Sequence, residues 1–251
     1  MLTKRIVACL DIADGKVVKG IKFKNHEVIG NIIELAQKYS NNGIDELVLY
    51  DIKASCSSKT VDYTWIENVA KVINIPFCVA GKIDSLEKVE MILNSGADKI
   101  SINSPAINNP NLISQIAEKF GSSTLVVGID TKDGFIYKNT GDSAQTEQIK
   151  ISVLEWAKDI ENRGAGEIIL NSINSDGTRC GYDIALLKQV CEIVNIPVIA
   201  SGGAGKMEHF LDVFQKTNVS GALAASVFHK NKIDIKKLGE YLIKNGLCIR
   251  I

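Results

Sequence analysis

Short apolar runs rich in β-branched residues recur along the whole chain, and polar, helix-like segments separate them. The runs are near-continuous in apolar character, which is typical of parallel strands covered by helices on their outer side. They cover residues 5–11, 46–52, 76–81, 98–103, 124–130, 167–172, 197–203 and 221–228. The pattern therefore predicts eight strands of one parallel sheet.

The segments between these runs show the spacing of apolar residues expected for helices that cover a sheet. Several of them end in glycine, the usual residue after a helix. They cover residues 32–43, 64–74, 85–96, 111–121, 153–164, 185–195, 208–217 and 235–246. Eight strand–helix alternations predict an α/β protein with a single (β/α)₈ TIM barrel over residues 1–251. An open doubly wound sheet is the alternative, but the GxGxxG turn expected after its first strand is absent.

The chain also contains an internal repeat with an offset of about 120 residues, or four strand–helix units. Residues 7–18 parallel 126–137, residues 43–52 parallel 164–173, and residues 75–83 parallel 196–204. We interpret this repeat as two duplicated half-barrels, about 1–121 and 122–251. Each group that binds a ligand in one half then has a counterpart in the other.

Charge and cysteine usage narrow the classes of partner. The 29 basic side chains balance 29 acidic ones, so we expect no nucleic-acid partner. No stretch approaches the length of a membrane span, and the N-terminal apolar run is too short for a signal peptide. The six cysteines form no CxxC pair and no metal-ligand spacing with the three histidines. We therefore expect a cytoplasmic protein with no membrane partner, no metal and no organic cofactor.

Two aspartates end the first and fifth predicted strands, which are partners in the repeat. TIM-barrel chemistry takes place at the carboxyl ends of the strands, so Asp11 and Asp130 are expected on opposite sides of one barrel mouth. Two such carboxylates suit a general acid and a general base. In the alternative interpretation they only cap loops, because Asp14-Gly15 and Asp133-Gly134 turns follow them.

Other strand ends carry polar residues and glycine turns that are typical of phosphate binding. Gly202 and Gly203, with Ala225 and Ser226, form one candidate phosphate site. The repeat predicts a second site at Gly81, Asn103 and Ser104, and hence a substrate with a phosphate at each end. The remaining strand-end candidates are Asp51, Asn171 and Ser201. Alternatively, the glycines only make tight turns.

Four charged residues lie near the starts of predicted strands. Arg5, Glu46, Lys99 and Glu167 are expected to face inward and close the barrel floor, because residues of equal parity share one face of a strand. Four inward charges are a costly way to fill a core, which favours a function over stability alone. Asp51 and Glu46 differ in parity, so the second barrel strand would need a twist or bulge for both to face inward.

The motifs ASGGAGKMEHF (200–210), DGTRCGYD (176–183) and GALAASVFHK (221–230) carry a specific resemblance. From end to end, the chain resembles the cyclase subunit of imidazole glycerol phosphate synthase, an enzyme of histidine biosynthesis. The resemblance implies a heterodimer with a glutaminase subunit, whose ammonia passes through the barrel. At the top, the ammonia would react with a ribulosyl-formimino aminoimidazole carboxamide ribotide that carries two phosphates. The products would be imidazole glycerol phosphate and aminoimidazole carboxamide ribotide.

The resemblance also implies roles for individual residues. Asp11 and Asp130 match the acid/base pair, Lys19 matches a loop lysine, and Asp98 matches a partner-docking residue. The ammonia-gate positions fall on Arg5, Glu46, Lys99 and Glu167. The phosphate-contact positions fall on Asn103, Gly177, Gly203 and Ser226.

Three residues depart from the family pattern. Lys82 follows Gly81 where a second glycine is usual, Asn31 replaces an aspartate, and Lys53 replaces a threonine. These changes either are tolerated or alter the substrate or the activity. The main alternative function is a paralog that delivers ammonia to another acceptor, such as a sugar precursor of surface polysaccharide. A sugar-isomerising barrel of the same pathway, or a subunit that only activates its glutaminase, fits less well.

Overall fold

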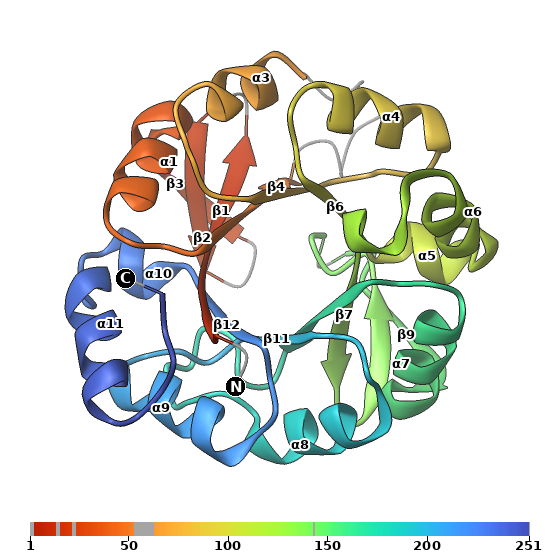
Figure 1. The fold of residues 1–251 in the computed structure, drawn as a ribbon. Coiled ribbons are helices and arrows are strands. Elements are labelled where there is room, and N and C mark those ends of the chain that lie inside the picture. Colours follow the sequence, from red (N-terminus) through yellow and green to blue (C-terminus); the bar gives the residue numbers. More distant parts are fainter. Residues whose placement is uncertain (1–2, 14–15, 22–23, 53–62, 143, 251) are drawn as a thin grey trace.

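The computed structural model describes residues 3–13, 16–21, 24–52, 63–142 and 144–250, and for residues 19–21 and 24–27 the backbone alone. Eight parallel strands form a closed barrel, in which the last strand pairs with the first (Figure 1). In barrel order they are β1 (Arg5–Ala13), β4 (Glu46–Asp51), β5 (Phe77–Ala80), β6 (Lys99–Ile102), β7 (Leu125–Lys132), β10 (Glu167–Ser172), β11 (Val198–Ser201) and β12 (Gly221–Ala224). The predicted (β/α)₈ barrel is confirmed.

Eight helices surround the barrel at the places where the spacing of apolar residues predicts them. They are α1 (Ile32–Asn41), α3 (Thr64–Ala70), α4 (Leu86–Asn94), α6 (Asn111–Phe120), α7 (Val153–Asn162), α8 (Ile184–Ile193), α9 (Met207–Lys216) and α11 (Ile235–Lys244). Short polar side chains start several of them; Ser152, for example, begins α7 with a capping box to Glu155. Two short helices, α5 (Ser104–Asn108) and α10 (Ser226–His229), and a 3₁₀ turn at Ser122–Thr124 complete the described set. The run 221–228 is thus a strand only to Ala224, and its last residues begin α10.

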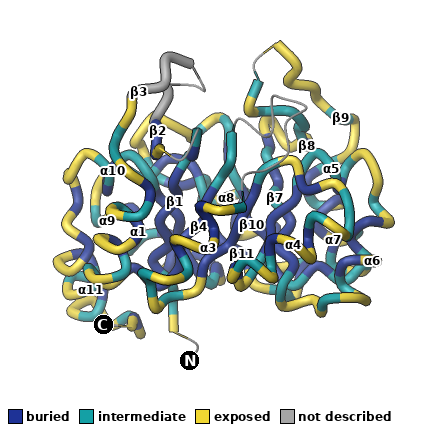
Figure 2. Tube along the Cα trace, turned by 90° about the horizontal axis from the view of Figure 1, so that it is seen from above, coloured by how far each residue is buried: buried dark blue, intermediate teal, exposed yellow. Residues whose placement is uncertain are grey.

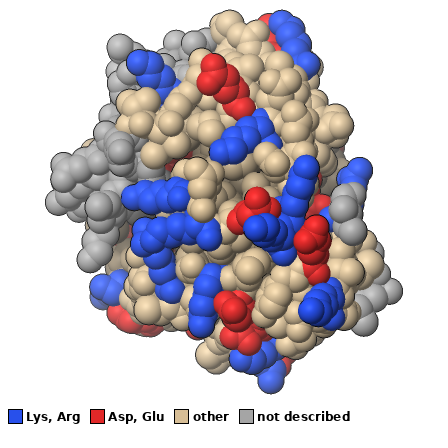
Figure 3. All heavy atoms as spheres, turned by 90° about the vertical axis from the view of Figure 1, so that its left-hand side faces the viewer, with Lys and Arg blue, Asp and Glu red and all other residues tan. Residues whose placement is uncertain are grey.

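Side-chain alternation divides the core into two parts. Outward-facing strand residues pack under the helices in one large apolar cluster. Inward-facing residues fill the barrel with a smaller cluster of Val7, Cys9, Val48, Cys78, Val126, Ile169, Ile199 and Leu223. Figure 2 shows the buried strands inside and the exposed positions on the outer helices. On the flank that carries α1 and α11, basic and acidic side chains are interspersed (Figure 3).

Two antiparallel hairpins, which the sequence analysis did not predict, extend from the strands that carry the two aspartates. The first is β2 (Lys16–Ile21) with β3 (Lys24–Asn31), and the second is β8 (Phe135–Lys138) with β9 (Glu147–Ser152). In register, Asp11 pairs with Val18 and Asp130 with Tyr137. Both hairpins rise from one end of the barrel, opposite the chain termini (Figure 2). The matching registers fit a duplication, while the half-barrel boundaries stay a prediction.

A closed ring of ion pairs forms the floor of the barrel, at the starts of the strands. Arg5 binds Glu46 (Nη1–Oε2, 2.7 Å) and Glu167, and Lys99 binds the same two carboxylates (Nζ–Oε, 2.9 and 2.8 Å). The glutamate side chains are only 5 and 7% exposed, against 25% for Arg5 and 18% for Lys99. Burial opposes the charge on both cations, but the two glutamates outweigh it and raise the pKa of Arg5 and of Lys99. The four predicted floor residues therefore do face one another.

Two aspartates tie adjacent strands together at the same end of the barrel. Asp45 accepts the backbone N–H of Ile6 at 2.7 Å, and Asp98 accepts that of Phe77 at 2.9 Å. Asp45 is buried, and the loss of hydration raises its pKa to about 6, although the bond from Ile6 acts in the opposite direction. Asp98 is exposed, so part of its carboxylate faces outward.

Within the described residues, no helix is long and apolar enough to cross a membrane. The same residues contain no cluster of three or more histidine, cysteine, aspartate or glutamate side chains that could hold a metal ion.

The ring predicts a specific pattern of stability changes. Replacing Lys99 by Met leaves two poorly solvated glutamates with one cation, so the free energy of unfolding should fall by about 2–3 kcal/mol. Adding Glu167→Gln to Lys99→Met should recover part of that loss, because it removes the excess negative charge. As a control, Lys216→Met breaks an exposed pair with Asp212 and should cost less than about 0.5 kcal/mol. Urea unfolding of the four proteins tests this; a Lys99→Met variant as stable as wild type contradicts it.

The pKa of Asp45 predicts how stability changes with pH. A carboxyl whose pKa is raised by folding stabilises the fold while it is protonated, and this contribution is lost as the pH rises through about 6. Asp45→Asn keeps an acceptor for Ile6 and cannot ionise. From pH 4.5 to pH 7.5, the free energy of unfolding of wild type should therefore fall by about 2 kcal/mol relative to that of this variant. Parallel pH dependences of the two unfolding free energies would refute the assignment.

Candidate active site

A large cavity opens at the carboxyl ends of the barrel strands. Its volume is about 1380 Å³, above the roughly 300–1,000 Å³ that is usual for a ligand pocket. Most of the predicted mouth residues line it: Asp11, Gly81, Asn103, Ser104, Asp130, Asn171, Gly177, Ser201, Gly202, Gly203, Ala225 and Ser226. The barrel thus brings together residues that are more than 200 positions apart in the sequence.

Asp130 is held on its wall of the cavity by three hydrogen-bond donors. Its Oδ1 accepts the Asn171 amide at 2.7 Å, and its Oδ2 accepts the Asn103 amide at 2.9 Å and the Thr140 hydroxyl at 2.5 Å. Desolvation by the surrounding protein raises the pKa of Asp130, and these three bonds counteract part of that rise. The carboxyl is therefore easier to protonate than an ordinary aspartate.

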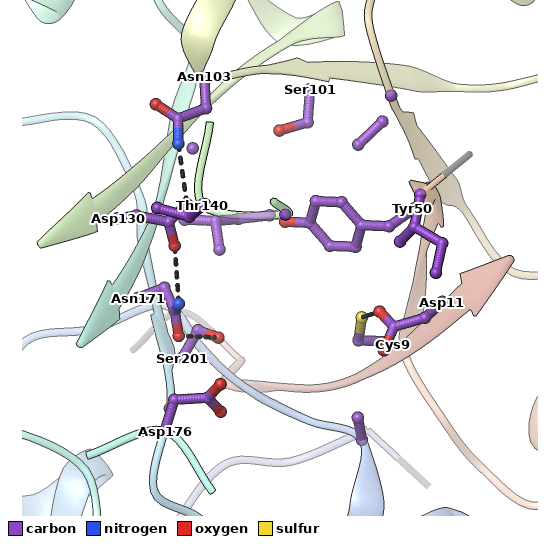
Figure 4. A pocket seen from close by; sticks show the side chains of 18 of the residues that line it. Cys9, Asp11, Tyr50, Ser101, Asn103, Asp130, Thr140, Asn171, Asp176 and Ser201 are labelled. Carbon is purple, nitrogen blue, oxygen red and sulfur yellow. Dashed lines mark hydrogen bonds between the residues drawn. The ribbon is translucent and has the colours of Figure 1, made fainter. Parts of the chain in front are cut away.

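Asp11 lies on the opposite wall, on β1. Its Oδ1 accepts the thiol of Cys9 at 3.6 Å, and its side chain is partly exposed to the cavity. Figure 4 shows Asp11 and Asp130 on opposite sides of the open space, with Tyr50 between the walls. The structure therefore places both predicted acid/base residues in one cavity, facing each other across it.

The two candidate phosphate sites share their backbone geometry. Asn103 precedes α5 with φ −125° and ψ −84°, and Ala225 precedes α10 with φ −125° and ψ −75°. Ser104 and Ser226 are thus equivalent first residues of two short helices. Since the amide of Asn103 donates to Asp130, this side chain positions the carboxylate.

The two glycine turns differ in one residue. Gly202 and Gly203 have φ +87° and +110°, and a Cβ on Gly203 would lie 2.0 Å from the Gly181 carbonyl oxygen. In the other half, Gly81 has φ +131° and Lys82 has φ +43°. The lysine thus has the left-handed backbone conformation that usually favours glycine. It also lines the cavity and adds a side chain at this end.

Asp51 does not line the cavity, unlike the other predicted strand-end residues. Strand β4 pairs with β1 and β5 without a register shift, so Glu46, Val48 and Tyr50 face inward by alternation. The expected twist or bulge is absent from β4, and Tyr50 takes the lining position. A role for Asp51 in binding substrate stays a prediction without support from this geometry.

Three further sequence predictions concern the loops. Lys19 lies in the part of β2 whose backbone alone is described, and Lys53 lies outside the described residues. Asn31 accepts the Ile33 N–H at 2.8 Å and caps α1, a role that asparagine and aspartate fill equally well. The departure at Asn31 therefore keeps the local structure.

Several lining residues escaped the sequence analysis. Tyr50 and Ser101 share the parity of Glu46 and Lys99, so alternation could have found both. Thr140 and Arg179 come from loops, where no periodic signal marks them.

Comparisons with known proteins show to which family the chain belongs. Residues 5–234 match the family described as histidine biosynthesis protein. The chain is 55% identical over 256 residues to the imidazole glycerol phosphate synthase subunit HisF of Pasteurella multocida (strain Pm70). It is 54% identical over 257 residues to the protein of that name from Proteus mirabilis (strain HI4320) and 53% identical over 257 residues to that from Vibrio campbellii (strain ATCC BAA-1116). Each alignment covers 100% of this chain and 100% of the relative. The chain therefore belongs to the histidine biosynthesis protein family, among the cyclase subunits of imidazole glycerol phosphate synthase that its sequence resembles.

Proposed function

We propose that the chain is the ammonia-using cyclase that the resemblance implies. It converts the ribulosyl-formimino aminoimidazole carboxamide ribotide with two phosphates into imidazole glycerol phosphate and aminoimidazole carboxamide ribotide. The observation that carries this proposal is the cavity itself, in which Asp11 and Asp130 face each other and which both candidate phosphate turns line. A long substrate with a phosphate at each end fits that arrangement.

The two aspartates divide the proton transfers of the first step. Ammonia that bonds to the ribulosyl ketone carbon releases one proton to a base. The ketone oxygen takes up that proton and a second one from an acid, leaves as water, and a protonated imine remains. Desolvation raises the pKa of Asp130, which suits a general acid. Asp11, on the opposite wall, is then the general base that accepts the proton from the nitrogen.

Each phosphate has its own set of candidate ligands. Gly202, Gly203 and Ser226 form one end, with Gly177 nearby in the cavity wall. Gly81, Lys82 and Ser104 form the other end, where Lys82 supplies a point charge. Ser201 donates to Asn171 at 3.2 Å, and Asn171 in turn donates to Asp130, so these two support the acid. Lys19 is proposed to reach the substrate from β2.

Ammonia reaches the cavity from the floor. The relatives are named subunits, which implies a complex with a partner chain. A glutaminase is the proposed partner, docked at the end where Asp98 faces outward. The ring of Arg5, Glu46, Lys99 and Glu167 is the proposed gate, and the apolar cluster above it favours neutral ammonia over the ammonium ion on the proposed route.

The alternative acceptor, a sugar precursor of surface polysaccharide, has no support in the relatives named above. The cytoplasm is the proposed location, in keeping with the buried thiol of Cys78.

The first test is turnover of the proposed substrate with excess ammonium salt and no partner. Wild type should convert it, whereas Asp130→Asn should lower kcat by about 10³-fold or more, since the amide cannot supply a proton. As a control, Asp84→Asn removes another cavity carboxylate, which pairs with Lys88, and should keep a far larger share of the rate. A correctly folded wild-type protein without turnover would refute the cyclase proposal.

Lys82 tests how one phosphate is held. Lys82→Gly should raise KM about tenfold with little change in kcat, because a point charge near one phosphate is lost. The same variant should be more stable by about 1 kcal/mol, since glycine adopts φ +43° without strain. The difference in KM should shrink at high salt. A fall in KM would instead mean that the lysine side chain obstructs the substrate.

A further inference from the structure

Asp130 receives its third hydrogen bond from outside the barrel. Asn103 directly follows β6, and Asn171 belongs to β10. These two strands flank β7, which carries Asp130. Thr140 instead belongs to the connection between β8 and β9, above the barrel mouth. In Figure 4, Thr140 lies beside Asp130 at the cavity wall. Its hydroxyl gives the shortest of the three bonds, at 2.5 Å.

One hydrogen bond anchors the connection that carries Thr140, and a second closes it into a turn. The Asn139 N–H donates to the Ser104 hydroxyl at 2.9 Å, and Asn139 has φ +56°. The Asp142 N–H closes the turn onto the Asn139 carbonyl at 3.0 Å. Ser104 is also a candidate phosphate ligand, and after accepting from Asn139 it keeps its own proton to donate. Thr140, which donates to Asp130, directly follows Asn139, which donates to the candidate phosphate ligand Ser104. One peptide bond thus joins the two contacts.

We propose that Thr140 is a positioning residue for Asp130, and that its hydroxyl holds the ionised form of that carboxylate. This inference rests on the proposed role of Asp130 as the acid. A hydroxyl that donates to a carboxylate stabilises the charged form, and it counters the desolvation at this site. Without such a donor, the carboxyl would hold its proton too tightly to pass it on and take it back in each cycle.

Other ionisable groups also face Asp130. Asp176, from the connection between β10 and α8, disfavours its negative charge. Tyr50 on β4 and Asp11 on β1 face it across the cavity. None of these groups is removed when Thr140 is replaced, so the effect of the hydroxyl can be isolated.

The experiment compares three threonine variants. Thr140→Val removes the hydroxyl at nearly constant shape, and Thr140→Ser keeps it. Thr146→Val is the matched control on the same connection, because among the described residues the Thr146 hydroxyl donates to the Asn139 and Asp142 carbonyls, at 3.4 and 3.0 Å, and not to Asp130. Carboxyl-carbon NMR titration follows the pKa of Asp130, whose signal is assigned by its loss in Asp130→Asn. Ammonium-dependent kcat/KM is measured over the same pH range.

Thr140→Val should raise the pKa of Asp130 by about one unit and move the alkaline limb of kcat/KM upward equally. Thr140→Ser and Thr146→Val should both stay within about 0.3 units of wild type. An unchanged titration of Asp130 in Thr140→Val overturns the inference, as does an equal shift in Thr146→Val. Because the NMR titration needs no turnover, an inactive wild type would refute the proposed function alone.

Discussion

Closure of the parallel barrel is the constraint on which every other feature depends. In a closed barrel each strand has one inward-facing set of residues, and alternation fixes that set over the full length of the strand. On β1 the set runs from Arg5 through Val7 and Cys9 to Asp11. The same strand therefore contributes to the ionic floor, the apolar lumen and the cavity. One register decides all three, so a slip by one residue would remove them together.

The two ends of the cavity are alike in backbone and differ in side chains, as a duplication of half-barrels would predict. The backbone angles of Asn103 and Ala225 nearly coincide, and both hairpins pair with their aspartate strands in the same register. The side chains of the two ends differ at two pairs of positions. Asn103 supports Asp130, while Ala225 has no such group, and Lys82 stands opposite Gly203 in the repeat. The similarity thus belongs to the backbone, and the side chains make the site directional.

The sequence predicted those parts of the molecule that follow from periodicity. The barrel, the outer helices and the inward charges at its floor depend on near-continuous apolar runs and on parity. The hairpins were missed because their strands, such as KNHEVIGN (24–31), are rich in polar residues and lack such a run. Asp51 is absent from the cavity wall because it differs in parity from Glu46, which faces inward at the start of the same strand. Thr140 could not be found, since its bond to Asp130 depends on the path of a loop that has no periodic pattern.

The floor ring has two positive and two negative members in alternating order, so its monopole is zero and its opposite dipoles largely cancel. The remaining field is mainly quadrupolar, and it decays with distance much faster than the field of a single charge. Close to the ring the field is strong, yet about one Debye length away, near 8 Å at physiological salt, little of it remains. The ring by itself therefore neither attracts nor repels ions from bulk water, and any long-range field at this end of the barrel comes from other charges, such as the exposed Asp98.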